Sequence, residues 1–179
     1  YPFAGYKKIL NEIYNQVLTT SAKRILDIGF GTGTLTTRLY EQGCEINGQD
    51  FSEEMINIAQ KKMPKANLYS GDFTNGLVEP LKRQSYDAII ATYSLHHLDN
   101  EQKILFIKSL LGLLKQGGII YIGDVAFQTR DGLESCRLDA GEYWDDEEIY
   151  FVYEELKEYL PNLKFEEYSF CSGLLTIKN

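Results

Sequence analysis

Hydrophobic and polar positions follow two periods along the chain, one typical of amphipathic helices and the other of buried strands. Within residues 6–18, apolar side chains recur three or four positions apart, as at Ile9, Ile13 and Val17, which predicts a helix. The same spacing, ended by Gly43, Pro64 or the Gly117-Gly118 pair, predicts further helices. These cover residues 35–41, 52–62, 99–116 and 145–160.

Short apolar runs bounded by glycine, aspartate or polar residues predict seven strands between and after these helices. The strands cover residues 24–28, 44–49, 67–70, 86–92, 119–124, 163–170 and 173–178. Residues 125–144 show no clear period and are expected to be irregular. Ser52 and Asp99 have the side chains that cap helix starts, and Gln102 completes a capping-box spacing with Asp99.

Strands that alternate with helices indicate βαβ units. The predicted fold is therefore α/β and doubly wound, with a mainly parallel seven-stranded sheet, helices on both faces and a C-terminal antiparallel hairpin. Such sheets bind ligands beyond the carboxyl ends of their strands. A glycine-rich turn, Asp50, Asp72, the stretch "TYSLHHL" and Asp124 all follow strands, so they are expected to meet at one edge.

The stretch "LDIGFGTG" places three glycines directly after the first strand. A dinucleotide-binding turn has a third glycine where this chain has Thr34, and a phosphate-binding P-loop needs a Gly-Lys-Ser/Thr ending that is missing. Asp27, two residues before Gly29, would repel a pyrophosphate and attract a cationic ligand. These residues disfavour a dinucleotide or a P-loop phosphate and favour a cationic ligand.

The pattern of an acidic residue followed by G-x-G-x-G resembles the first motif of class I S-adenosylmethionine-dependent methyltransferases. The family has a Rossmann-like fold and uses S-adenosylmethionine, which carries a sulfonium cation, an amino group and a ribose diol. The resemblance implies that this loop contacts the cofactor's amino-acid part. The residues concerned are Asp27, Gly29, Phe30, Gly31 and Gly33.

Further motifs follow in the family's order. Asp50, in "GQDFSEEM", resembles the acidic residue that accepts both ribose hydroxyls, a task suited to a carboxylate. Phe51 and Met55 would then flank the adenine, although the position of Met55 on a helical face favours the core over a ligand contact. "GDF" resembles the third motif, in which Asp72 accepts from the adenine amino group and the Phe73 amide faces a ring nitrogen.

The stretch "YDAIIATYSLHHL" resembles the family's fourth strand, whose end, here Thr92 and Tyr93, runs under the cofactor and faces the substrate. His97, His96 and Tyr93 are the candidate catalytic groups, and Asp124 is a further candidate base, because imidazole titrates near neutral pH. A structural role for the histidine pair is the alternative. No metal is expected, since no third ligand has suitable spacing.

Composition narrows the choice of partners. A net charge of −8 argues against nonspecific nucleic-acid binding, and no apolar run reaches the roughly 18 residues of a membrane span. Cys44, Cys136 and Cys171 are too scattered for a disulfide framework, so reduced thiols and a cytoplasmic location are expected. The acidic stretch 131–148 is either a solvated face or a surface beside the acceptor.

The expected organisation is a single methyltransferase domain over residues 1–179. A helical segment, 1–23, precedes a cofactor-binding half, 24–125, and a substrate-side segment, 126–179. No Asn/Asp-Pro-Pro-Tyr/Phe motif follows the fourth strand, which by family analogy favours a small-molecule acceptor attacked in line over adenine or glutamine. A noncatalytic cofactor-binding module and an NAD-dependent oxidoreductase remain as alternatives, and the sequence leaves the oligomeric state open.

Overall fold

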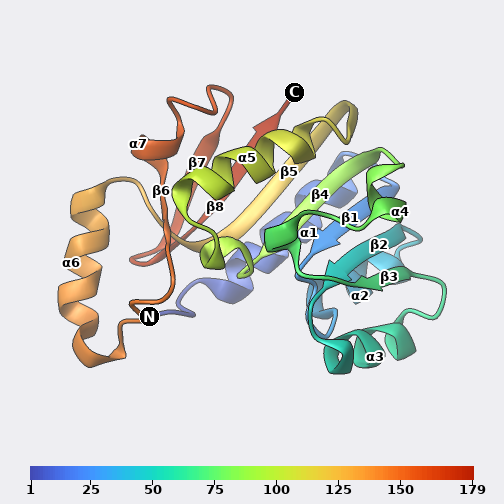
Figure 1. Cartoon of the computed structure of the whole chain (residues 1–179), viewed down its shortest axis with the longest axis horizontal. Helices are drawn as coiled ribbons and strands as arrows, with labels where there is room; N and C mark the ends of the chain where they lie inside the picture. The colour runs from blue at the N-terminus through green and yellow to red at the C-terminus, as the bar shows by residue number, and fades with distance from the viewer.

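The computed structural model describes residues 1–179 and contains a central sheet covered on both faces by helices (Figure 1). The helices are α1 (Tyr6–Thr19), α2 (Thr34–Glu41), α3 (Glu53–Lys62), α4 (Glu79–Lys82), α5 (Asn100–Leu111), α6 (Arg130–Ala140) and α7 (Tyr153–Leu156). The strands are β1 (Arg24–Ile28), β2 (Glu45–Asp50), β3 (Asn67–Ser70), β4 (Tyr86–Thr92), β5 (Leu114–Phe127), β6 (Phe151–Val152), β7 (Lys164–Ser169) and β8 (Ser172–Lys178).

The strand order is β3-β2-β1-β4-β5-β8-β7, and the two-residue strand β6 pairs with the end of β5. All pairs from β3 to β5 are parallel, whereas β8 runs antiparallel to both β5 and β7. The fold class and the seven predicted strands are thus confirmed, with β6 as an addition that the pattern did not predict. The order reverses beside β1, so the carboxyl ends of β1 and β4 diverge there and leave a crevice.

Two hydrophobic cores lie on opposite faces of the sheet because side chains alternate along each buried strand. In β1, Ile25 packs against α1, α2 and α3, whereas Leu26 and Ile28 pack on the face covered by α5 and α7. The central strands are nearly continuous apolar runs because both faces of the sheet are covered. No helix combines the length and apolar character needed to cross a bilayer.

The first two thirds of the chain follow the predicted pattern closely. The cap at Ser52 accepts from the Met55 amide at 3.3 Å, and Asp99 and Gln102 form the predicted capping box. The four-residue helix α4 was not predicted, and two boundaries are wrong: the predicted helix 99–116 is shorter and the predicted strand 119–124 is longer. Helix α5 ends at Leu111, and Gly117 lies within β5 in a local irregularity that shifts its register with β4.

Two predictions for the C-terminal third are wrong. Residues 125–144, expected to be irregular, contain the end of β5 and helix α6, whose cap Thr129 accepts from the Gly132 amide at 3.1 Å. Residues 145–160, expected to be helical, contain β6 and only four helical residues, those of α7. Residues 145–150 form a turn and an irregular segment, in which Ile149 donates to the His96 carbonyl at 2.7 Å and accepts from the buried Lys103 ammonium.

Candidate functional site

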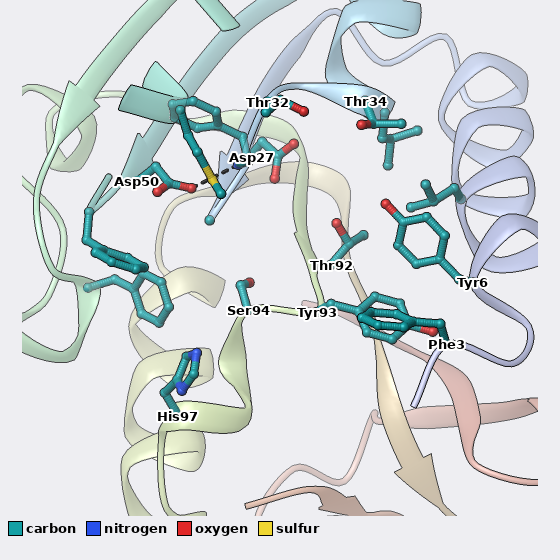
Figure 2. Close-up of a pocket in the computed structure, with 18 residues that line it drawn as sticks. Phe3, Tyr6, Asp27, Thr32, Thr34, Asp50, Thr92, Tyr93, Ser94 and His97 are labelled. Atoms are coloured by element: carbon teal, nitrogen blue, oxygen red, sulfur yellow. Dashed lines mark hydrogen bonds between the residues drawn. The ribbon is translucent and has the colours of Figure 1, made fainter. Parts of the chain in front are cut away.

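A cavity of about 490 Å³ opens where β1, β2 and β4 end, at the predicted edge of the sheet (Figure 2). Its size lies within the range of roughly 300–1,000 Å³ typical of small-molecule sites. It is lined by Phe3, Tyr6, Leu10, Asp27, Gly29, Phe30, Gly31, Thr32, Thr34, Leu35, Asp50, Phe51, Met55, Phe73, Thr92, Tyr93, Ser94 and His97. No lysine or arginine is among them.

The glycine loop after β1 needs its glycines for two different reasons. Gly29, Gly31 and Gly33 all have left-handed φ angles, of +69°, +61° and +81°, which side chains tolerate poorly. A Cβ on Gly29 would also lie 2.4 Å from the Ser94 Cβ, so β4 and the loop could not approach. At Gly31 a Cβ would meet only the Met55 sulfur, at 3.9 Å, because this part of the backbone faces the cavity.

Asp50 ties the end of β2 to the glycine loop. It is 4% exposed, and its Oδ2 accepts from the Gly31 amide at 2.8 Å, while its Oδ1 accepts from the Ser52 amide at 3.0 Å. Each carboxylate oxygen can accept about two hydrogen bonds, so both oxygens keep acceptor capacity. Figure 2 shows this carboxylate pointing into the cavity, where it can accept from a pair of hydroxyls.

Asp27 is the more unusual carboxylate. It is 2% exposed, and its Oδ1 is buried without any hydrogen-bond partner. Burial, with a smaller contribution from the charge of Asp50, raises the pKa of Asp27 from 3.8 to about 7. A buried carboxylate that faces a cavity with a free oxygen is suited to a cationic donor such as an ammonium group.

The predicted adenine contacts divide into two groups. Phe51 and Met55 line the cavity and are 70% and 43% exposed, so Met55 lies at the site rather than in the core. Phe73 also lines the cavity, is buried, and stacks on Phe106, with ring centroids 5.9 Å apart.

Asp72 does not line the cavity in this conformation. Its exposed carboxylate caps the turn that follows, where Oδ1 accepts from the Thr74 amide at 2.9 Å and from the Thr74 hydroxyl at 2.7 Å. These bonds lower the pKa of Asp72, so it stays ionised. Its other oxygen remains free, and its role toward adenine remains a prediction.

The structure separates the two histidines. His96 is 8% exposed and does not line the cavity; its Nδ1 lies 2.9 Å from Asp124 Oδ1, and its Nε2 lies 3.2 Å from Glu148 Oε1. Burial opposes its protonation, but the bond and charge of Asp124, together with Glu148, raise its pKa overall. His97, in contrast, is exposed at the cavity wall, and its ring points inward in Figure 2.

Sequence reasoning missed one side of the cavity. Phe3, Tyr6 and Leu10 come from the chain start and α1, and only the amphipathic pattern of α1 pointed to a buried face there. Ser94 was missed as well; its hydroxyl donates to the Ile28 carbonyl at 2.9 Å and holds the end of β4 against the loop. Thr34, which replaces the third glycine of a dinucleotide turn, also lines the cavity.

A family model described as "Methyltransferase domain" matches residues 25–118, which include the loop, Asp50 and the end of β4. The chain belongs to the class I S-adenosylmethionine-dependent methyltransferases. S-adenosylmethionine is the cofactor of this family. Membership favours methyl transfer over the oxidoreductase alternative.

Relatives support the same family. An uncharacterized methyltransferase of Oceanobacillus iheyensis is 32% identical over 176 residues, which cover 93% of this chain and 79% of the relative. One from Geobacillus sp. strain WCH70 is 36% identical over 141 residues, which cover 78% of this chain and 63% of the relative. The match therefore spans less than two thirds of the Geobacillus protein.

Two solved structures share the fold. Magnesium protoporphyrin IX methyltransferase from Synechocystis PCC 6803, with bound S-adenosylhomocysteine, superposes with a TM-score of 0.75 at 19% identity, covering 98% of this chain and 84% of that one. An S-adenosylmethionine-dependent methyltransferase from Clostridium acetobutylicum ATCC 824 gives the same TM-score and identity, covering 97% and 91%.

Proposed function

We propose that residues 1–179 act as one catalytic domain that binds S-adenosylmethionine in the cavity and methylates a small-molecule acceptor. The single observation that carries this proposal is the pair of buried carboxylates, Asp27 and Asp50, on either side of an open glycine loop. A pyrophosphate there would meet two negative groups and no lysine or arginine. A phosphate-free ligand with a cationic group and a diol would find an acceptor for the cation at Asp27 and one for the diol at Asp50.

The residues fit the parts of this cofactor. Asp50 would accept from the ribose diol, and the carboxylate of Asp27 would accept from the cationic amino-acid part. Phe51, Met55 and Phe73 offer apolar surfaces to the adenine. The tyrosine hydroxyl of Tyr6 points into the cavity from the other side in Figure 2, and is available as a donor to the carboxylate end.

When bound, S-adenosylmethionine supplies a methyl group on a sulfonium, which an acceptor lone pair takes by in-line displacement while the S–CH₃ bond electrons return to sulfur. The chain itself contributes alignment and a partly dry cavity. His97 is the proposed proton acceptor because it faces the cavity and can pass a proton to solvent. His96 is held between two carboxylates, which favours a positioning role.

The decisive test is calorimetric titration of Asp50→Ala with S-adenosylmethionine. Loss of two hydrogen bonds to a charged acceptor, at about 1.5–3 kcal/mol each, should weaken binding by about 100-fold or more. Asp131→Ala, which removes an exposed carboxylate in α6, serves as the matched control and should bind like the unmodified chain. Equal affinity for Asp50→Ala would refute the ribose assignment.

A second measurement separates an enzyme from a noncatalytic binding module. The chain is incubated with S-adenosylmethionine and a panel of small-molecule acceptors, and S-adenosylhomocysteine is quantified. Acceptor-dependent formation of S-adenosylhomocysteine is expected. Tight binding without turnover on any acceptor would favour the binding module, and binding of NADH instead of S-adenosylmethionine would contradict the proposal entirely.

A further inference from the structure

Three aromatic rings from distant parts of the chain form one wall of the cavity. Phe3, Tyr6 and Tyr93 lie with ring centroids 5.1–6.2 Å apart, in edge-on and tilted contacts. Figure 2 shows Tyr93 and Phe3 side by side on the side of the cavity away from Asp50. Their wall therefore lies at the end of the cavity that the proposed nucleoside contacts do not use.

Tyr93 is held in this wall at an energetic cost. Its φ of +52° lies in the left-handed region, which non-glycine residues rarely adopt, and such a conformation costs on the order of 1–2 kcal/mol. The conformation is fixed because the Tyr93 amide donates to the Gly123 carbonyl at 2.8 Å. Strain of this kind is typical of functional sites, where it aims a side chain that an ordinary turn would point elsewhere.

Phe3 is the exposed member of the wall. It is 66% exposed even though it packs beside Tyr6 and Tyr93, so much of its ring faces solvent at the cavity mouth. A flat ligand lying on this ring would remove apolar surface from water. His97 lies across the cavity from this wall, with Ser94 between the two sides in Figure 2.

The charges that line the cavity as a whole disfavour anions. The cavity wall contains Asp27 and Asp50 but no lysine or arginine, and the whole chain carries a net charge of −8. An acceptor with a carboxylate or phosphate would lose hydration without gaining a cationic partner. The lack of a lysine or arginine in the cavity wall therefore contributes to the selection of uncharged over anionic acceptors.

We infer that the methyl acceptor is an uncharged aromatic molecule that lies against Phe3, Tyr6 and Tyr93 and directs a nucleophilic O–H, N–H or S–H group toward His97. This inference rests on the proposed function. The acceptor's lone pair forms the bond to the methyl carbon, the S–CH₃ electron pair returns to sulfur, and the acceptor's proton goes to the neutral His97 imidazole. His97 then releases the proton to solvent, so atoms and charge balance.

The test measures binding, so it does not require the true acceptor. The chain is first saturated with S-adenosylhomocysteine, and that binding is confirmed by calorimetry. It is then titrated with 2-naphthol and with 2-naphthoate, which share the same rings and carry a neutral hydroxyl and an anionic carboxylate, respectively. We expect 2-naphthol to bind at least about 10-fold more tightly than 2-naphthoate.

Two variants locate the bound ring. Phe3→Ala should weaken 2-naphthol binding by about 5-fold or more, because it removes one aromatic contact and its buried area. Phe170→Ala removes an equally exposed ring, 62% against 66%, outside the cavity, and should leave the affinity within about twofold. S-adenosylhomocysteine affinity should be the same in both variants, which shows that each is folded.

The outcomes separate this inference from the proposed function. If S-adenosylhomocysteine does not bind, the proposed function is wrong, and the inference falls with it. If it binds but 2-naphthoate matches or exceeds 2-naphthol, or if neither ring binds, only the aromatic neutral acceptor is refuted. Equal losses in Phe3→Ala and Phe170→Ala would likewise refute the placement on the aromatic wall.

Discussion

Replacing Asp27 with asparagine should stabilise the free chain and weaken the binding of S-adenosylmethionine. Asparagine has nearly the same shape as aspartate but cannot ionise. Asp27 is 2% exposed and has a buried oxygen without a partner, so its negative charge is costly in the absence of a cation. The same charge is what the proposed cationic ligand needs.

The magnitude follows from the pKa of Asp27, which burial raises from 3.8 to about 7. Below pH 3.8 the Asp27 carboxyl is protonated in both the folded and the unfolded chain, so its titration does not change the free energy of unfolding. Between the two values the folded chain keeps a proton that the unfolded chain has released. The free energy of unfolding therefore falls by about 1.4 kcal/mol for each pH unit, to a total on the order of 4 kcal/mol at pH 7 and above.

Urea unfolding of both proteins between pH 5 and pH 8 measures this cost. The stability of Asp27→Asn relative to the unmodified chain should rise by about 3 kcal/mol over that range, mostly below pH 7. Any constant penalty from burying the asparagine amide cancels in this comparison, because it does not depend on pH.

Calorimetry at the same pH values supplies the second half of the test. Binding to the unmodified chain should weaken by up to about tenfold per pH unit below pH 7, since the ligand requires ionised Asp27. Asp27→Asn should bind at least about tenfold more weakly at pH 8 and should lack this dependence. Parallel stability curves for the two proteins, or equal affinities at pH 8, would refute the reasoning.

Three further substitutions probe the loop and the histidines. Gly29→Ala should abolish cofactor binding or folding, because its Cβ would lie 2.4 Å from the Ser94 Cβ; a thermal shift with S-adenosylmethionine equal to that of the unmodified chain would contradict this. His97→Ala should lower turnover by about 10²-fold or more at unchanged melting temperature, whereas His96→Ala should lower the melting temperature because it leaves buried Asp124 without its partner. Because the pKa of His96 is raised, its stabilising effect should be largest at acidic pH and disappear as pH rises through the folded pKa.

Local patterns were sufficient for the parallel half of the fold. Strand β1 and strand β4 have the predicted bounds, and the caps at Ser52 and Asp99 form as expected. Buried parallel strands are continuous apolar runs, and caps depend on side chains within three residues. Both signals are contained in short stretches of sequence.

The C-terminal third could not be predicted in the same way. Residues 145–150 form a turn and an irregular segment, and Ile149 bonds to the His96 carbonyl and the Lys103 ammonium, partners more than 40 residues away in the chain. Apolar residues in this segment have helical spacing, but they pack against β5 and α6 without forming a helix there. Long-range contacts override local propensity in such segments.

By itself the sequence identified the loop, since three closely spaced glycines after a strand predict left-handed backbone angles, and it predicted two carboxylates beside that loop, Asp27 and Asp50. Only the tertiary structure decided which groups share the cavity. It brought Phe3 and Tyr6 beside Tyr93, enclosed His96 between carboxylates and left His97 at the wall. The physical reason is that burial and contact depend on how distant elements pack, and adjacent residues of identical type can therefore have opposite surroundings.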